Sequence, residues 1–565
     1  MNVPSAAALR AANPAARPGV RAPRVARTAA RSPSFTLPYP SVRVPVLGRQ
    51  MVATSQPLAA QAGLAVLTAG GNAIDAAICA AATLTVVEPV MNGLGSDAFA
   101  LVWDGESLHG LNGSGRAPAG FALSRFRGRR KMPALGWDAV TVPGAVHAWV
   151  TLWRRFGSRP FAELLQPAIR YARDGFPVMP VTAGLWRAQA SRYRGFAEFS
   201  RVFLPGGKAP PPGAIFRNPD LADTLEQLAA SEGAAFYEGA VAARIAAAAA
   251  AEGGVMDEGD LSGHRSAWVQ PLSRPFGRAV VHELPPNGQG LASLLALGIL
   301  DRLRIARLPP ESVEAVHLQT EAMKRAFAIC HRHVADPAAM VVDPEALLSD
   351  EALDRAARAI ERVKASPPGA PIPAQHGTVY LATADAAGRM VSFIQSNYLG
   401  FGSGVVVPGT GIAMQNRALG FSLDPRHPNC VAGGKRPYHT IMPGFATVDG
   451  QPSAAFGVMG GHMQPQGHVQ MMLRLFGHGQ NPQAACDAPR WHVTERSEVA
   501  LEPGFSAEVA RGLGARGHRL VPRPPTVLFG GAQIIQRFSG GDSATPDVVY
   551  WGGSDPRKDG QAVAI

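Results

Sequence analysis

The run from Gln375 to Gly411 constrains the fold more than any other part of the chain, because it holds two alternating segments separated by a short turn. Residues 378–385 read TVYLATAD and residues 390–396 read MVSFIQS, with Ala-Ala-Gly-Arg between them. Branched and aromatic residues on both sides of a glycine-containing turn indicate a β-hairpin. We therefore predict two paired strands, with Thr378 at the first position of the first strand.

The placement of Thr378 suggests a nucleophile. Gly377 precedes it and leaves a sterically open approach to the peptide bond between the two residues. If the Thr378 hydroxyl cleaves that bond, Thr378 becomes an N-terminal residue that supplies nucleophile and base together. An α-amine with a pKa of roughly 7.7–8.0 suits a base that works near neutral pH. The alternative is an ordinary threonine, a residue favoured in strands.

This run resembles the start of the small subunit of the γ-glutamyltransferase family, whose members cut themselves before a threonine that begins a similar hairpin. The Gly460-Gly461 pair in GVMGGHMQPQG and the KRP motif at residues 435–437 also match the family's pattern. The resemblance covers residues 39–565. It implies an α+β fold, the four-layer αββα sandwich of the N-terminal nucleophile hydrolases.

The resemblance also implies a catalytic set and a division of the chain. Self-cleavage between Gly377 and Thr378 would give a large subunit, residues 39–377, and a small catalytic subunit, residues 378–565. Gly460 and Gly461 would turn N–H groups toward a developing oxyanion. Ser396 stands where the family usually has a threonine whose hydroxyl bonds the nucleophile. Without the resemblance, the glycine pair is a turn and Ser396 is a strand serine.

The positions that read the substrate in γ-glutamyl enzymes differ here. Family members place an arginine three residues before an Ala-Pro pair, where it grips the substrate α-carboxylate. In this chain Ser114 takes that position and the arginine is Arg116, which is either a substrate contact or a solvated side chain. Two serines usually follow the KRP motif, and here His439 and Thr440 replace them.

Two further differences lie before the FSL sequence at residues 421–423. Gly420 stands where an acidic residue would bind the substrate amine. Arg417 stands where the family often has Gln or Glu, and a cation there favours an anionic acyl tail. A site that has lost both recognition groups should not favour a free α-amino acid, because its polar groups would lack partners.

We therefore predict a self-processing amidohydrolase or acyltransferase that works through an ester on Thr378. The substrate is expected to be a small amide, as in oxamate amidohydrolase-like members of the family. A true γ-glutamyltransferase or glutathione hydrolase, acting on γ-glutamyl substrates, is the competing interpretation. A non-catalytic scaffold with the same fold is a third.

Composition limits the other function classes. The net charge is +12, but the first 48 residues hold seven arginines and no acid, which leaves +5 for the rest of the chain (12 less 7). We expect residues 1–38 to be a disordered basic extension. No basic stripe with aromatic platforms indicates nucleic-acid binding. No signal peptide or run of about 18 apolar residues is recognised, so we expect a cytoplasmic protein without a membrane segment.

Cysteine and histidine spacing gives no sign of a metal or cofactor site. The four cysteines lack CxxC spacing, and His427, His439, His462 and His468 form neither HxH nor HExxH. We expect no cofactor and no metal. The expected partners are the two subunits of one precursor. Two such pairs are expected to associate as a dimer of heterodimers.

Periodicity predicts several elements outside the hairpin. We expect a helix within residues 55–71 with Ser55 as its cap, a second, alanine-rich helix within 72–89, and a third over 235–254 that ends at Gly-Gly. In a long helix from about residue 311, Val316, Thr320, Met323 and Phe327 recur at helical spacing and indicate core packing. Residues 402–414 are predicted to form a pair of strands.

Overall fold

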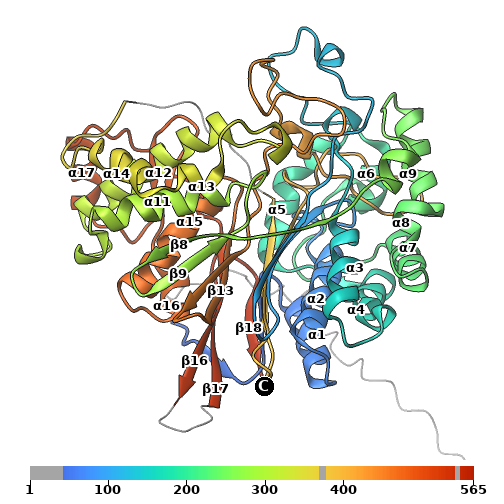
Figure 1. Ribbon diagram of the computed structural model, residues 1–565. Coiled ribbons are helices and arrows are strands. Elements are labelled where there is room, and N and C mark those ends of the chain that lie inside the picture. The colour runs from blue at the N-terminus through green and yellow to red at the C-terminus, as the bar shows by residue number, and fades with distance from the viewer. Residues whose placement is uncertain (1–41, 368–376, 541–546) are drawn as a thin grey trace, which may run out of the picture. The chain divides into compact units, whose positions relative to one another are not determined.

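Two seven-stranded antiparallel sheets lie face to face between layers of helices in the computed structural model (Figure 1). The structure describes residues 42–367, 377–540 and 547–565. The expected disordered extension, residues 1–38, lies outside these ranges. Strands β10 and β11 of one sheet pack against strand β13 of the other. This sheet-on-sheet core between helices confirms the predicted four-layer αββα sandwich.

The first sheet, which we call the nucleophile sheet, carries the predicted hairpin at its centre. Its order is β18 (Gln561–Ala564), β2 (Met51–Thr54), β10 (Val379–Ala384), β11 (Met390–Ser396), β3 (Asp97–Trp103), β4 (Leu108–Gly113) and β7 (Ala267–Val269). The opposing sheet runs β1 (Val46–Gly48), β17 (Asp547–Ser554), β16 (Gly531–Gly540), β13 (Gln451–Met459), β12 (Gly444–Val448), β9 (Ala279–Glu283) and β8 (Leu272–Phe276).

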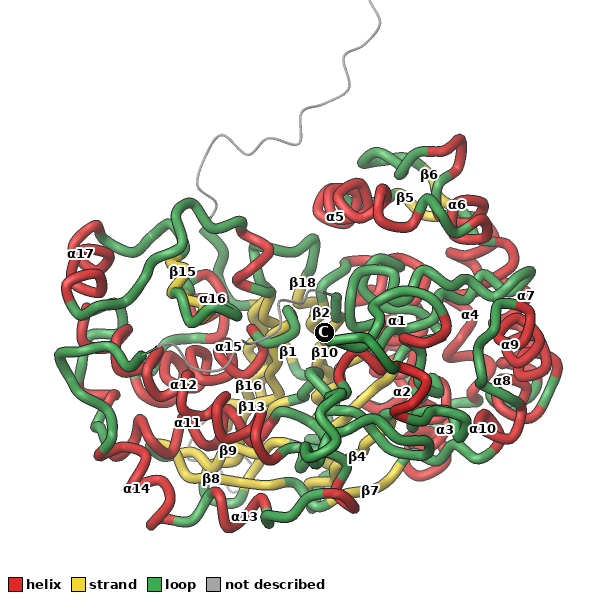
Figure 2. Tube along the Cα trace, turned by 90° about the horizontal axis from the view of Figure 1, so that it is seen from above, coloured by secondary structure: helices red, strands yellow, loops and turns green. Residues whose placement is uncertain are grey.

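Helices cover the outer faces of both sheets, as the view along the sheets shows (Figure 2). The helices on the side of the nucleophile sheet are α1 (Pro57–Thr68), α2 (Ala73–Val87), α3 (Ala145–Phe156), α4 (Phe161–Asp174), α7 (Pro219–Ala230), α8 (Ala235–Glu238), α9 (Ala240–Ala251) and α10 (Glu258–Ser262). The helices on the other side are α11 (Gly290–Arg302), α12 (Val313–His333), α13 (Pro344–Leu347), α14 (Asp350–Arg358), α15 (Met463–Met472), α16 (Pro482–Asp487) and α17 (Ala507–Ala515).

Smaller elements complete the described chain. Helices α5 (Pro180–Ala190) and α6 (Ala197–Phe203) lie near the short pair β5 (Phe176–Pro177) and β6 (Ile215–Phe216). Strands β14 (Trp491–Val493) and β15 (Val499–Leu501) form a second short pair. No helix in the described part of the chain is both long and apolar enough to cross a membrane.

The predicted hairpin is confirmed, and its position explains its composition. Strands β10 and β11 pair antiparallel from Val379↔Gln395 to Ala384↔Met390. Both strands are buried along their whole length, because α2 covers one face and β13 the other. Buried central strands favour the branched and aromatic residues found here. Thr378 lies immediately before β10, at the end of the sheet.

The helix predictions hold in part. The four positions predicted to pack from α12 are all buried, and α1 and α2 occupy the expected ranges. The prediction that Ser55 caps α1 is wrong. The Gln56 side chain caps this helix and accepts hydrogen bonds from the backbone N–H groups of Leu58 and Ala59. The single helix expected over 235–254 is two helices. Gly239 has extended backbone angles, which ends α8 and begins α9.

The strands expected within residues 402–414 are replaced by a looped segment with two isolated bridges, Val406↔Ala413 inside the segment and Met414↔Gly95. Glycines cause the difference. Gly404, Gly409 and Gly411 have positive φ, a conformation that interrupts a strand. The segment packs over the end of the nucleophile sheet, where Gln415 N donates to Gly95 O.

The burial of His282 on β9 predicts a pH dependence of stability. Burial lowers the pKa of His282 to about 4 from an ordinary 6.5. Between these values the unfolded chain binds a proton that the folded chain does not, so the folded state loses stability as pH falls. In a His282→Gln variant this loss is absent. We expect the wild-type free energy of unfolding, measured relative to the variant, to fall by about 2 kcal/mol between pH 7 and pH 5. Urea denaturation at the two pH values measures it, and a constant difference would contradict it.

Candidate active site

The Thr378 side chain is buried at the end of the nucleophile sheet, beside the peptide bond that precedes it. Its hydroxyl oxygen lies 2.8 Å from the carbonyl oxygen of Gly377 and 3.2 Å from Ser396 Oγ. Gln464 Nε2 approaches the same hydroxyl at 3.4 Å. Only 1% of Thr378 is exposed, so water is largely excluded from the hydroxyl. The predicted nucleophile and the predicted cleavage site are therefore in contact in the uncut chain.

Gly377 must be a glycine for steric reasons. Its φ is +153°, within the region that side chains disfavour. A Cβ atom added to it would lie 2.7 Å from the carbonyl oxygen of Tyr398 and 2.9 Å from the nitrogen of Gly400. The backbone of residues 398–400 thus packs directly against the residue that precedes the nucleophile.

The register of strands β10 and β11 determines the position of Ser396 relative to Thr378. Because Val379 pairs with Gln395, the next step of the ladder brings Ser396 opposite Thr378. The Ser396 hydroxyl donates to the Gly377 carbonyl oxygen at 2.5 Å and accepts from the backbone N–H of Tyr398 at 2.8 Å. A hydroxyl that accepts one hydrogen bond becomes a stronger donor for the next. Ser396 is thus placed to polarise the Gly377 carbonyl group.

Arg417 also contacts the Ser396 hydroxyl. Its Nη2 donates to Ser396 Oγ at 3.1 Å and its Nη1 donates to Thr440 Oγ1 at 2.8 Å. The guanidinium also stacks on the Tyr398 ring, 4.2 Å from the ring centre. Burial lowers the pKa of Arg417 to about 10, which leaves the group protonated at neutral pH. The structure thus places this cation one hydroxyl away from the nucleophile.

Gly460 and Gly461 follow β13 and come shortly before Gln464, whose side chain contacts Thr378. Both have positive φ, +119° and +61°. Gly461 is held through its carbonyl oxygen, which accepts from Gln289 Nε2 at 3.0 Å. Within the described residues, no hydrogen bond uses the N–H group of either glycine. These N–H groups are therefore available to a ligand.

His439 is buried in a pair with Asp97, a residue of β3 that lies across the ladder from Ser396. Its Nε2 lies 3.0 Å from Asp97 Oδ2, and its Nδ1 accepts from Ile441 N at 3.3 Å. Burial raises the pKa of Asp97 to about 7 and lowers the pKa of His439 well below its ordinary value. A substrate contact from His439 would require one of these hydrogen bonds to break.

Ser114 and Arg116 differ in exposure. Ser114 is fully buried, and its hydroxyl donates to Asn112 Oδ1 at 2.7 Å. Arg116 has a half-exposed side chain that pairs with Asp336 at 3.2 Å. A different arginine, Arg436 of the KRP motif, donates from Nε to the Ser114 carbonyl oxygen at 3.0 Å. The sequence motif had not indicated this inward direction of Arg436.

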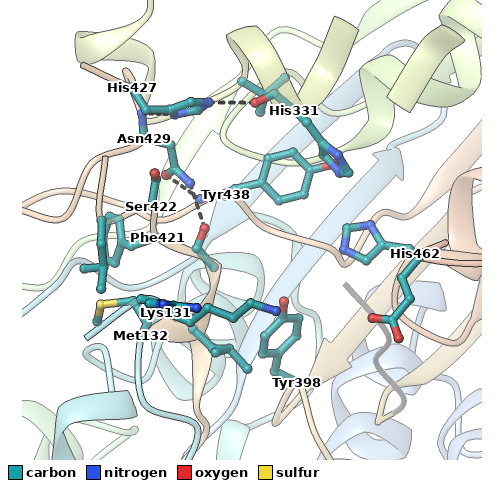
Figure 3. Close-up of a pocket in the computed structure, with 16 residues that line it drawn as sticks. Lys131, Met132, His331, Tyr398, Phe421, Ser422, His427, Asn429, Tyr438 and His462 are labelled. Carbon is teal, nitrogen blue, oxygen red and sulfur yellow. Dashed lines mark hydrogen bonds between the residues drawn. The ribbon is translucent and has the colours of Figure 1, made fainter. Parts of the chain in front are cut away.

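A pocket of about 540 Å³ opens beside these residues (Figure 3). Three of its lining residues are close in sequence to residues of the site: Tyr398 lies two residues after Ser396, Tyr438 precedes His439, and His462 follows Gly461. The lining consists of Arg130, Lys131, Met132, His331, Val334, Tyr398, Leu419, Gly420, Phe421, Ser422, Leu423, His427, Asn429, Tyr438, His462 and Glu495.

Steric crowding explains why position 420 carries no acidic side chain. A Cβ atom on Gly420 would lie 2.4 Å from the carbonyl oxygen of Tyr438. The backbone as it stands therefore leaves no room for a carboxylate side chain at this wall of the pocket.

One group of possible metal ligands occurs in the described part of the chain, namely His317, Glu321 and His518. Lys324 already occupies this group, with its ammonium 2.8 Å from Glu321 and 3.3 Å from His518. The two imidazoles bond each other at 2.8 Å. The ammonium supplies the positive charge that the carboxylate needs, and we assign no metal here.

Sequence reasoning missed three polar residues of this site. Gln464 touches the nucleophile, Gln289 holds the Gly461 carbonyl, and Asp97 lies behind Ser396. The only available signal for Gln464 was its place in the segment GGHMQ, directly after the glycine pair. Gln289 and Asp97 belong to distant segments that only the folded chain brings together.

The facing antiparallel sheets and a threonine immediately before a central strand are typical of the N-terminal nucleophile hydrolases. Comparison with known proteins gives the family. The γ-glutamyltranspeptidase family model matches residues 59–565. The chain therefore belongs to the γ-glutamyltranspeptidase family, and it is an amide-hydrolysing enzyme of that class.

Individual relatives cover nearly the whole chain. An oxamate amidohydrolase proenzyme of Klebsiella pneumoniae is 38% identical over 89% of this chain and 96% of its own length. A glutathione hydrolase-like proenzyme of Bacillus subtilis is 35% identical over 92% and 98%. The crystal structure of a cephalosporin acylase from Bacillus halodurans superposes with a TM-score of 0.88 at 48% identity, covering 94% of this chain and 99% of that chain.

Proposed function

We propose that the chain matures by its own cleavage between Gly377 and Thr378. Thr378 Oγ bonds to the Gly377 carbonyl carbon, the peptide C–N bond breaks, and the hydroxyl proton passes to the departing nitrogen. Water then hydrolyses the resulting ester, which leaves a Gly377 carboxylate and a free Thr378 hydroxyl and amine. The observation that carries this proposal is the buried Thr378 hydroxyl in contact with both the Gly377 carbonyl and Ser396. The products are a large subunit ending at Gly377 and a small subunit, residues 378–565.

The mature enzyme then cleaves amides by the same chemistry. The Thr378 hydroxyl attacks the substrate carbonyl while the free α-amine accepts its proton, and the amine product leaves from an acyl ester. N–H groups of Gly460 and Gly461 stabilise the oxyanion, each donor contributing about 3 kcal/mol. Water completes hydrolysis, or a second amine completes transfer.

The substrate is an amide whose acyl group is not recognised as an α-amino acid. Gly420 offers no carboxylate to a substrate amine, and the Ser114 hydroxyl already bonds Asn112. Roles for Arg116, His439 and Thr440 as substrate contacts stay predictions from the sequence. Arg417 already donates to Ser396 Oγ and Thr440 Oγ1, and we assign it to positioning of the Ser396 hydroxyl rather than to contact with an acyl tail.

A matched pair of substrates tests this proposal. Glutaryl-p-nitroanilide differs from γ-glutamyl-p-nitroanilide only by lacking the α-amino group. We expect kcat/KM for the glutaryl compound to equal or exceed that for the γ-glutamyl compound. A true glutathione hydrolase, the alternative function, favours the γ-glutamyl compound by about 100-fold or more, because its amine-binding groups lose their partner. That outcome would contradict the proposal.

A non-catalytic scaffold is distinguished by its lack of maturation. It would migrate as a single band of 59.2 kDa on a denaturing gel, whereas the enzyme gives two fragments. The dimer of heterodimers and the cytoplasmic location stay predictions from the sequence.

A further inference from the structure

The pocket beside Tyr398 contains recognition groups that the cleavage chemistry does not use. His331 Nε2 and His462 Nδ1 are buried and have no hydrogen-bond partner within the described residues. His462 is 4% exposed, and the two rings meet edge to face at 5.5 Å. Buried polar atoms in folded proteins normally have partners. Both residues line the pocket, so a ligand bound there can supply the missing hydrogen bonds.

The body of the pocket suits a flat, apolar group. The aromatic rings of Tyr398, Phe421 and Tyr438 line it together with Met132 and Val334. Figure 3 shows Tyr438 on the same side as His331 and His462, with Tyr398 across from them. Aromatic walls of this kind favour stacked or edge-on contact with a ring. The volume of about 540 Å³ lies within the range of pockets that hold drug-sized molecules, far above the need of a two-carbon acid.

The charges of the pocket favour an anion. Arg130 and Lys131 are exposed, and neither forms an ion pair in the part of the chain that the structure describes. Lys131 extends toward the Tyr398 ring (Figure 3). Glu495 is the one carboxylate in the lining and already has a partner. Burial lowers the pKa of His331 to about 4 and that of His462 well below its ordinary value, so both rings are neutral near pH 7.

We propose that this pocket is the substrate subsite and takes a ring-bearing amide that also carries a carboxylate. The ring lies among Tyr398, Phe421 and Tyr438, polar groups of the ligand bond His331 and His462, and the carboxylate pairs with Lys131 and Arg130. This inference rests on Thr378 as the nucleophile.

Binding to the full-length Thr378→Ala protein tests the subsite without any need for turnover. The probes are 4-carbamoylbenzoate, benzamide, which lacks the carboxylate, and oxamate, which lacks the ring. By calorimetry, we expect 4-carbamoylbenzoate to bind at least about tenfold more tightly than either of the others. Equal affinities, or tightest binding of oxamate, would overturn the proposal.

Variants locate the contacts. Lys131→Met is expected to remove most of the preference for 4-carbamoylbenzoate over benzamide, and His462→Gln to weaken both ring compounds by about tenfold. The matched control is Lys364→Met, an exposed lysine of another surface, which should change nothing. If Lys131→Met leaves the preference intact, the carboxylate assignment is wrong.

Turnover separates this inference from the proposed function. Wild-type enzyme that cleaves glutaryl-p-nitroanilide but shows no ring or carboxylate preference refutes the subsite alone. The opposite result is also informative. If the Thr378→Ala protein binds the probes as expected but the wild type neither matures nor turns over any amide, the role of Thr378 as nucleophile is refuted and the subsite is not.

Discussion

Replacing Thr378 with alanine is expected to leave a single uncut chain that hydrolyses no amide. The substitution removes the oxygen that lies against the Gly377 carbonyl, and no neighbouring group can replace it, because Ser396 already uses its proton on that carbonyl. We expect amide turnover to fall by at least about 10⁴-fold, the scale seen when a catalytic nucleophile is removed. A denaturing gel and a p-nitroanilide assay measure the two effects.

Thr378→Ser provides the matched control, because it keeps the hydroxyl and removes only a methyl group. It should mature and turn over, more slowly than wild type. Maturation of Thr378→Ala at the wild-type rate would refute Thr378 as the nucleophile of self-cleavage.

Replacing Arg417 with methionine is expected to slow maturation by about 100-fold, the loss typical of one preorganised donor. Arg417 donates to Ser396, which in turn donates to the carbonyl that Thr378 must attack. Without the guanidinium, Ser396 keeps only two neutral donors, the Tyr398 N–H and the Thr378 hydroxyl, and it polarises the carbonyl less. Time-resolved mass spectrometry of newly made protein measures the cleavage rate. Arg417→Lys should recover part of it.

Arg436→Met is the matched control for a buried arginine of the same region. Arg436 donates to the carbonyl oxygens of Ser114 and Arg265 and touches neither Ser396 nor Thr378. We expect this variant to be less stable and yet to cleave, once folded, within a few-fold of wild type. If both variants slowed cleavage equally, Arg417 would have only a structural role.

The sequence was most informative where the structure depends on local contacts. The alternation in TVYLATAD and MVSFIQS, with a short turn between, is enough to define the hairpin, and antiparallel register then brings Ser396 opposite Thr378. The same local reasoning failed at Gly239, because one extended glycine divides a segment that its alanine content predicts to be a continuous helix.

The polar surroundings of the nucleophile could not be predicted in the same way. Arg417 begins a short 3₁₀ helix and Gln289 lies directly before α11. Both reach the site only through the packing of the two sheets, and neither has a spacing that marks its role. Family position predicted a charged residue near the substrate at 417, but the direction of its side chain is set by Thr440 and the Tyr398 ring. Tyr398 itself has a positive φ of 77°, a conformation that no periodic pattern reveals.

N-terminal sequencing of purified, catalytically active protein tests the central claim most directly. The account predicts two chains, one of which begins Thr-Val-Tyr-Leu-Ala-Thr-Ala-Asp, with its opening residue at position 378. Active protein that consists only of the uncut chain, or a new terminus at any other residue, would contradict it.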